Sequence, residues 1–323
     1  MAPATPVPGS VFGQVFLDPD LTVSGGGLYL TWELSRPTGS PPRMALARVN
    51  TADGRIAASN EFSPGFVSVP LYAAGSLWVT DSSSLGELLL RLDPRTLMVT
   101  GELQVADRFP GSGADGHIAY AGGSIWVDGA DRLLQVAPQT VTQERVIPLP
   151  RAASSDVAAS SDGGTLIVTE ADGGGRGTVQ RRDPATGALL ASHAVLGVHA
   201  PRIGGVTGGV AWIAEPTGMM GYVERFQTAA MTPDTATMVQ GTNGIRADIW
   251  DGVLWVSNQV GGATVNYCAA PGTGRRLAPL PLPDMNRDTL QAAGGGDLYY
   301  SYGTADGYRI GAARIPAACL ADR

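Results

Sequence analysis

A glycine-rich turn followed by an apolar, aromatic strand recurs along the whole chain of 323 residues. The pattern occurs seven times, and successive anchor residues are 41 to 49 positions apart. This is the length of a four-stranded propeller blade, and a repeat of this extent constrains the fold more strongly than any short motif. The segments are GGGLYLTW (25–32), AGSLWVTD (74–81), GGSIWVDG (122–129), GGTLIVTE (163–170), GGVAWIAE (208–215), DGVLWVSN (251–258) and GGDLYYSY (295–302), anchored by Tyr29, Trp78, Trp126, Ile167, Trp212, Trp255 and Tyr299.

Each repeat has the same internal order of four strands. In the second repeat we expect strands over Val67–Ala73, Leu77–Thr80, Glu87–Leu92 and Met98–Val105. The turn Asp93–Thr96 combines an Asp that can bond back to the backbone with a Pro that presets φ. Chain breakers recur too often for an amphipathic helix of ten residues or more.

The chain ends predict a closed ring. The seventh repeat stops before a fourth strand, and the alternating segment Ser10–Leu17 is left over ahead of the first repeat. We expect this segment to form the outer strand of the last blade, because closure removes free sheet edges. The predicted fold is therefore all-β, a seven-bladed β-propeller of four-stranded antiparallel blades over 10–316, with tails at 1–9 and 317–323.

Composition excludes several classes of function. All 22 basic residues are arginine, which removes the Walker lysine, Schiff-base lysines and Ser-x-x-Lys dyads. A net charge of −7 argues against a nucleic-acid partner. Two cysteines and three histidines exclude four-cysteine zinc sites and iron–sulfur clusters. The sequence has no apolar run long enough to span a membrane.

The repeat pattern, Gly-x-hydrophobic-Trp-Val-Thr-Asp/Glu followed by Arg-x-Asp-Pro-x-Thr-Gly, resembles the seven-bladed YVTN-type and virginiamycin B lyase-like propellers. That resemblance implies the propeller fold, and for the lyases it implies metal-assisted elimination that opens a cyclic depsipeptide, with histidines on neighbouring blades. Counting from the anchors aligns His117 with Ala158, Ile203 and Arg246. The pair of histidines is absent from these positions, which argues against that same activity.

Long connections on one face of the repeats, among them Ala214–Gly221, are expected to carry the site, because loops on a rigid scaffold are where binding and catalysis concentrate. Their central mouth is predicted from three rows of residues counted from the anchors. Eleven positions before the anchor are Asp18, Val67, Asp115, Asp156, Pro201, Gly244 and Asp288. Nine positions before it are Asp20, Val69, His117, Ala158, Ile203, Arg246 and Leu290, and three positions after it are Trp32, Asp81, Gly129, Glu170, Glu215, Asn258 and Tyr302.

These rows predict an acidic funnel with basic groups below its rim. We assign catalytic roles to His117, Asp115, Asp156 and Arg246, and we expect Asp115, Asp156 and His117 to form a divalent-cation site (Mg²⁺ or Ca²⁺). No organic cofactor is expected. The expected substrate-binding residues are Asp18, Trp32, Asp81, Glu170, His199, Arg202, Glu215, Asn243, Asn258, Arg287, Asp288 and Tyr302. A structural alternative for each Asp is that it accepts backbone N–H bonds and ties adjacent blades.

Cys268 and Cys319 both fall near the lower ends of third strands in adjacent repeats, so a disulfide between them is one expectation and two buried thiols are the other. A disulfide and the small, proline-rich start of the chain favour a secreted or periplasmic protein over a cytoplasmic one. We also expect a monomer.

Two functions remain in competition. The first is an enzyme of the lyase, hydrolase or cyclase type that acts on a small molecule or natural product in the funnel. The alternative is a non-catalytic exported propeller that binds a ligand or a protein.

Overall fold

The structure is a computed structural model, and its chain separates into two compact units. Unit 1 comprises Met1–Phe109 and Pro281–Ile315, and unit 2 comprises Pro110–Leu280 and Pro316–Arg323. The prediction of one domain over 10–316 stays a prediction. The structure describes 10–12, 14–35, 42–62, 65–83, 86–106, 117–129, 131–149, 154–172, 174, 176–196, 201–207, 209–217, 220–242, 246–250, 252–260, 263–280, 282 and 290–321.

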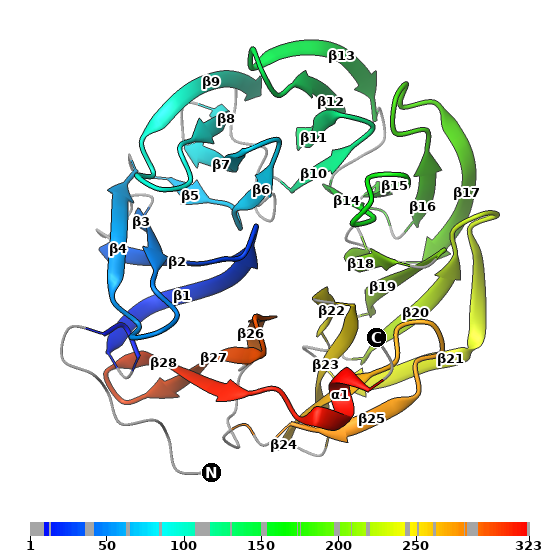
Figure 1. Ribbon diagram of the computed structural model, residues 1–323. Coiled ribbons are helices and arrows are strands. Elements are labelled where there is room, and N and C mark those ends of the chain that lie inside the picture. The colour runs from blue at the N-terminus through cyan, green and yellow to red at the C-terminus, as the bar shows by residue number, and fades with distance from the viewer. Residues whose placement is uncertain are drawn as a thin grey trace. The chain divides into compact units, whose positions relative to one another are not determined.

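Unit 2 consists of four antiparallel sheets in chain order, each with four strands in sequential order (Figure 1). One short helix, α1 (Ala317–Leu320), follows the last strand of the chain. The sheets are β10 (Ile118–Ala121), β11 (Ser124–Gly129), β12 (Arg132–Ala137) and β13 (Thr142–Pro148); β14 (Ser154–Ala159), β15 (Leu166–Ala171), β16 (Arg176–Arg182) and β17 (Leu189–Leu196); β18 (Arg202–Thr207), β19 (Val210–Thr217), β20 (Met220–Gln227) and β21 (Thr232–Thr242); β22 (Arg246–Trp250), β23 (Val253–Val260), β24 (Ala263–Ala269) and β25 (Arg276–Pro279).

Unit 1 contains the first, second and last repeats in two sheets. One sheet has the order β26-β27-β28-β1-β2-β3-β4, and the other pairs β5, β7, β8 and β9 in order with β6 also on β7. The strands are β1 (Val15–Ser24), β2 (Gly27–Ser35), β3 (Arg43–Val49), β4 (Ile56–Glu61), β5 (Phe66–Val67), β6 (Leu71–Ala73), β7 (Ser76–Ser83), β8 (Gly86–Leu92), β9 (Val99–Ala106), β26 (Leu290–Gly294), β27 (Asp297–Thr304) and β28 (Gly307–Arg314).

The N-terminal segment completes the last repeat, as the sequence predicts. Val15 and Phe16 pair antiparallel with Arg309 and Tyr308 of β28, while the rest of β1 pairs with β2. Phe12 also bridges to Ile310 of β28, whereas Ser10 bridges to Arg55 and so lies off this edge. The closing strand is therefore shorter than the predicted Ser10–Leu17. The all-β class and the four-stranded antiparallel pattern are confirmed, and the number of blades stays a prediction.

The anchor residues form the cores between neighbouring sheets. Trp78, Trp126, Trp212 and Trp255 are at most 1% exposed, and Ile167 is fully buried. Trp126 packs with Leu166 and Val168 of the following sheet. Burying a large aromatic side chain in this way contributes on the order of 2–3 kcal/mol relative to leaving it in water. These five anchors are thus core residues.

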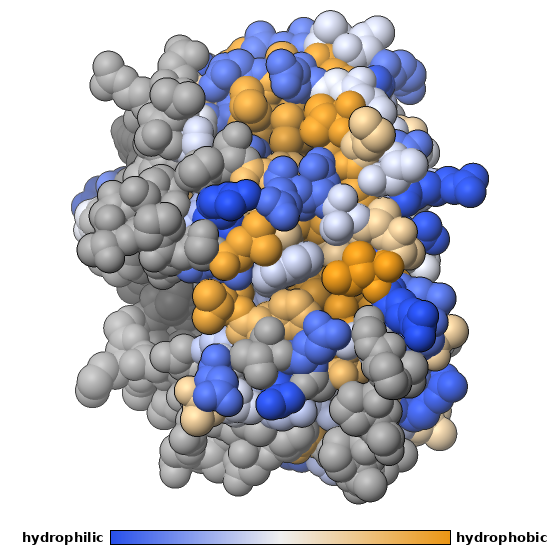
Figure 2. Space-filling model, turned by 90° about the vertical axis from the view of Figure 1, so that its left-hand side faces the viewer, coloured by the Kyte–Doolittle hydropathy of each residue, from blue (hydrophilic) through white to orange (hydrophobic). Residues whose placement is uncertain are grey.

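The outer strands are the most exposed part of each sheet. In unit 1, Ile56 of β4 is 42% exposed and Met98, which precedes β9, is 68% exposed. Figure 2 shows the side of the molecule on which β4 lies, where apolar side chains alternate with polar ones. Such interleaving follows from the period of two along a strand with one face buried and one in water.

Turns between third and fourth strands dock onto the preceding sheet in unit 2. The Trp126 indole donates to Pro184 O at 3.3 Å, and the Trp212 indole donates to Pro271 O at 2.9 Å. Arg181, which pairs with anchor Ile167, donates to Ala229 O at 3.1 Å, and Arg225, which pairs with Trp212, donates to Gly272 O. An anchor and the residue opposite it on the third strand therefore bind the next repeat's turn.

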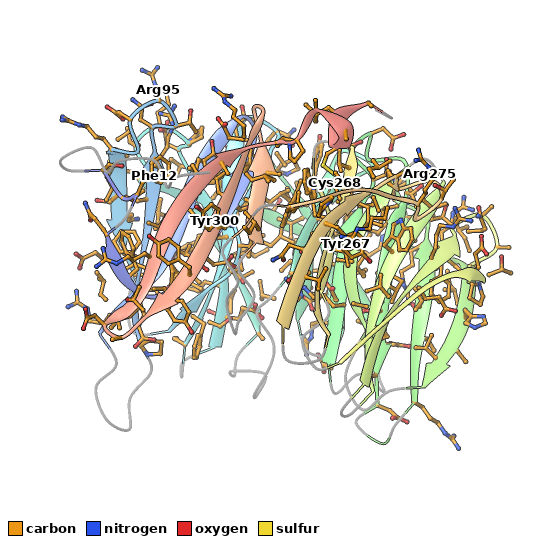
Figure 3. All side chains as sticks on the ribbon, turned by 90° about the horizontal axis from the view of Figure 1, so that it is seen from below. Phe12, Arg95, Tyr267, Cys268, Arg275 and Tyr300 are labelled. Carbon is orange, nitrogen blue, oxygen red and sulfur yellow. A yellow bond between two sulfur atoms is a disulfide. The ribbon has the colours of Figure 1, made fainter. Side chains whose placement is uncertain are left out.

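Cys268 occupies this same position in the last sheet of unit 2. It pairs with anchor Trp255 and forms a disulfide with Cys319 of α1, with a Cα–Cα distance of 5.8 Å. Figure 3 places Cys268 beside α1. The last repeat takes its fourth strand from the N-terminus, so the chain after β28 is a tail rather than a turn. The disulfide binds this tail where other repeats bind a turn by hydrogen bonds, and the expected cysteine pairing is confirmed.

Candidate functional site

The ends of the first strands in unit 2 bring together several of the predicted catalytic residues. Nδ1 of His117 lies 3.1 Å from Oδ1 of Asp156, which belongs to the following sheet. The Nδ1 atom is buried and makes no well-aligned hydrogen bond to any described residue, so the contact is a close approach of a ring nitrogen to a carboxylate oxygen. The His117 side chain is 36% exposed, and since Nδ1 is covered, the rest of the ring faces solvent.

Asp156 itself is buried and bonded to the backbone of the next sheet. Its side chain is only 6% exposed, and its Oδ2 accepts the backbone N–H of Ile203 in the third sheet of unit 2 at 2.7 Å. A buried carboxylate needs such partners, because leaving it unpaired costs several kcal/mol. Asp156 therefore ties its sheet to the next one, which is the structural alternative anticipated for these aspartates.

A second carboxylate, Asp128, was missed by the sequence analysis. Its Oδ1 accepts the backbone N–H of His117 at 2.5 Å, and its Oδ2 accepts the Ser155 hydroxyl at 3.1 Å. Asp128 is 3% exposed and lies two positions after the anchor Trp126. Asp128 is visible in the sequence as the Asp of GGSIWVDG, but the predicted site used the residues three positions after each anchor. Asp128 holds the main chain of His117 in place.

The strand pairing shows which first-strand residues occupy equivalent positions in their sheets, which we call the same level, and it differs from the alignment expected from the sequence. Asp156 pairs with Thr169, Arg202 with Ala214 and Arg246 with Ser257. His117 lies opposite Asp128 through the bond from Asp128 N–H to His117 O. Each partner is two positions after its anchor. The first-strand row of unit 2 is therefore His117, Asp156, Arg202 and Arg246.

The alignment of His117 with Ala158 and Ile203 is wrong for two structural reasons. The turn between β14 and β15 occupies 160–165, whereas Ala121 and Ser124 bracket a two-residue turn in the preceding sheet. In β18 the register shifts between Ile203 and Gly205. Counting back nine positions from the anchor therefore reaches this row in the first and fourth sheets of unit 2, at His117 and Arg246, but not in the second and third sheets.

Several expected binding residues make internal contacts instead. Oε1 of Glu170 accepts Gln180 Nε2 at 2.7 Å and the Thr178 hydroxyl at 3.1 Å. In unit 1, the Trp32 ring packs edge-on against Phe16 at 5.7 Å. The Tyr302 ring lies 6.0 Å from that of Tyr300 and is partly exposed. Of these three residues, Tyr302 and Trp32 keep some surface for a ligand, while the Glu170 carboxylate is already bonded.

Asp81 of unit 1 is buried rather than at a rim. It is 9% exposed, and its Oδ1 has no hydrogen-bond partner within the described ranges. Gly65 lies so close that a Cβ there would come 3.0 Å from Asp81 Oδ1. Loss of hydration on burial raises the pKa of Asp81 to about 6.

We expect the effect of Asp81→Asn to depend on pH. Because the folded-state pKa is raised, the unfolded chain releases this proton first, so the Asp81 contribution to stability falls as pH rises from about 4 to about 6. At pH 7 the cost of keeping the buried Asp81 carboxylate ionised is on the order of 2 kcal/mol. Urea unfolding should show that Asp81→Asn changes the free energy of unfolding, relative to wild type, in a more stabilising direction at pH 7 than at pH 4.5.

The exposed turn residue Asp93 provides the control for this test. Its Oδ1 accepts the Thr96 and Arg95 N–H groups, which lower the pKa of Asp93. Asp93→Asn should therefore show almost the same effect on stability at pH 7 and at pH 4.5, because a carboxyl with a lowered pKa changes its contribution only below the unfolded-state value of about 3.9. Equal pH dependence of both variants would contradict the assignment to Asp81.

The remaining predicted residues are placed only in part. Arg202 is exposed and begins β18, in the first-strand row. Four others have a described backbone, and their side chains lie outside the description: Asp18 in β1, Glu215 in β19, Arg246 in β22 and Asn258 in β23. Five lie outside the described residues altogether: Asp115, His199, Asn243, Arg287 and Asp288. The connection expected to be long at Ala214–Gly221 is instead a tight hairpin, in which Thr217 pairs with Met220.

A metal site stays a prediction. Within the described ranges, no group of three or more His, Cys, Asp or Glu side chains is arranged to hold an ion. The expected trio includes Asp115, which lies outside those ranges, while the other two members are His117 and Asp156 at 3.1 Å. In the same ranges, no helix is both long and apolar enough to cross a membrane.

Comparison with solved structures identifies the fold. BamB from Moraxella catarrhalis superposes with a TM-score of 0.52 at 10% identity, covering 91% of this chain and 84% of the other. A chain of the mitotic checkpoint complex superposes with a TM-score of 0.62 at 12% identity, covering 97% and 91%. Both are β-propellers, so this chain has the β-propeller fold. No protein-family model and no curated protein matches the sequence.

Proposed function

We propose that this protein is a non-catalytic binding propeller, which recognises a small molecule or protein at the first-strand ends of unit 2. The observation that carries the proposal is that Asp156, one of the expected acid–base residues, and Asp128, which the sequence analysis missed, both serve as structural ties. Asp156 accepts the Ile203 N–H and Asp128 accepts the His117 N–H, so each carboxylate has a structural partner. The His117 ring is partly exposed and Arg202 is exposed there, which suits recognition.

The similar folds support this proposal over an enzyme of the lyase, hydrolase or cyclase type. One of the two superposed chains comes from the mitotic checkpoint complex, which is an assembly of proteins. The Cys268–Cys319 disulfide supports an exported protein, because disulfides persist in oxidising compartments and are rare in the cytosol.

A binding screen that also follows the fate of the ligand separates the two functions. Thermal shifts are measured against a panel of small molecules and peptides, and each stabilising compound is then recovered and examined by mass spectrometry. We expect at least one compound to raise the melting temperature and to be recovered unchanged. Chemical conversion of a compound by the wild type but not by His117→Ala would instead establish an enzyme.

A further inference from the structure

The tail that follows β28 is joined to unit 2 through one buried residue. Among the described residues of 316–321, only Cys319 is buried, while Ala317 and Ala318 are exposed. Within the described ranges, no hydrogen bond joins this tail to a strand of unit 2, and the Cys319 N–H donates to Pro316 O inside the tail itself. The disulfide from Cys319 to Cys268 is therefore the main link between the tail and its sheet (Figure 3).

The helix α1 depends on that link for its order. It has only four residues, Ala317–Leu320, and no side chain caps its N-terminus at Pro316. A helix this short is unstable in water without tertiary packing. The start of the tail is held separately, because the Ile315 N–H donates to Gly296 O at 3.0 Å. We therefore expect the tail of the reduced protein to open as a short chain end that stays attached at Ile315.

Cys268 is held far more firmly than Cys319. It is fully buried in β24, where it pairs with Trp255 of β23 and with Ala278 of β25. Its Sγ lies 3.6 Å from Ala278 O. Moving this sulfur out of the sheet requires separation of paired strands, which costs more free energy than the opening of a chain end. The two thiols of the reduced, folded protein therefore differ in their access to a reagent.

From this difference we propose that an external disulfide closes the bond by reacting first with Cys319, the entry thiol, and that Cys268 is the resolving thiol. The Cys319 thiolate attacks the external disulfide, forms a mixed disulfide with one of its sulfurs and releases the other as a thiolate. The Cys268 thiolate then attacks Cys319 Sγ, which forms the native bond and releases the second external sulfur. The protein loses two electrons and two protons, and the external disulfide becomes two thiols.

The fold brings the two sulfurs together for the second step. When the tail docks, the Cα atoms of Cys268 and Cys319 lie 5.8 Å apart, within the range that a disulfide requires. The external disulfide belongs to a thiol–disulfide oxidoreductase or to a small molecule, since both react by the same exchange. A mobile chain end can reach the disulfide of either one, whereas a sulfur between paired strands cannot. This inference goes beyond the binding function and does not depend on it.

Alkylation of the reduced wild-type protein tests the order of access without any substitution. The protein is reduced, freed of reductant without air, treated briefly with iodoacetamide and digested with trypsin. Cleavage after arginine places Cys268 in peptide 247–275 and Cys319 in peptide 315–323. We expect Cys319 to be labelled about tenfold faster than Cys268, or more, in the folded protein. In concentrated guanidinium the two rates should become nearly equal, because the sheet no longer covers Cys268.

A matched pair of variants tests the exchange chemistry. Cys268→Ser keeps the entry thiol, Cys319→Ser keeps the resolving thiol, and both lack the disulfide. With oxidised glutathione, we expect the glutathione adduct to form about tenfold faster on Cys268→Ser, or more, as measured by intact mass. Oxidation of the reduced wild type is then timed with oxidised glutathione and with an oxidised oxidoreductase at equal disulfide concentration. Faster closure by one of them identifies that class as the partner.

The results either support the order of attack or overturn it. Equal labelling of the two cysteines in the folded protein, or faster labelling of Cys268, would overturn it. A reduced wild type without a cooperative thermal transition would also overturn it, because access would then not depend on the folded sheet. None of these measurements uses a ligand of the first-strand ends in unit 2, so the proposed binding function is tested separately by the compound screen.

Discussion

Removing the Cys268–Cys319 disulfide should lower the free energy of unfolding by about 4 kcal/mol. The bond links residues separated by 51 positions, and in the chain-entropy model a closed loop of this length restricts the unfolded chain by about that amount. The double variant Cys268→Ser/Cys319→Ser avoids a leftover thiol and is the appropriate test. Guanidinium unfolding should show a clear decrease in midpoint relative to wild type.

Reduction of the wild-type protein serves as the control for this prediction. Treatment with a thiol reductant should lower its midpoint to that of the double variant and leave the double variant unchanged. The same midpoint for oxidised and reduced protein would show that the disulfide does not stabilise the fold. Loss of protection from proteolysis should begin at α1, because the bond anchors the tail that contains this helix.

Trp212→Ala should cost about 3–5 kcal/mol, the second of the two largest effects. Trp212 is fully buried and packs with Leu254 and Val256 of the next sheet, so truncation leaves a large cavity. The alanine variant also removes the indole donor to Pro271 O. Urea unfolding measures the loss, and a cost below about 1 kcal/mol would contradict a core role for this anchor.

The variant Trp212→Phe distinguishes the loss of packing from the loss of the hydrogen bond between the indole and the turn. Trp212→Phe keeps most of the buried ring and should cost only about 1–2 kcal/mol. Hydrogen exchange of the Thr273 and Gly274 amides should increase in this variant, because the turn they form loses its bond to Trp212. In the matched variant Trp255→Phe the lost bond runs to Trp250 O within the same sheet, so exchange in 270–274 should not change.

Features with a local cause were predictable from the sequence. The turn Asp93–Thr96 forms as expected, because Asp93 accepts the Arg95 and Thr96 N–H groups. Alternation within each repeat predicted the four-stranded sheets. The missing final strand predicted that the N-terminal segment would pair with β28, which Val15 and Phe16 do.

The candidate site was less predictable, because it depends on register between separate strands. Residues His117 and Asp156 were both selected, yet they were placed two positions apart in the rows and in fact share one level. The long turn at 160–165 and the register shift in β18 cause this difference. Neither has a sequence signature that counting from an anchor can detect.

The sequence by itself determined the kind of sheet and the closing strand, since each follows from a pattern within a few residues or from the repeat length. It left open whether Cys268 and Cys319 form a disulfide or stay as buried thiols, and the structure shows the disulfide. Only the tertiary structure decided how the charged side chains are used. Whether an aspartate faces a ligand or a backbone N–H depends on which strand of another repeat lies beside it. For Asp156 that neighbour is Ile203, and the resulting bond makes the residue a tie between sheets while Arg202 stays exposed.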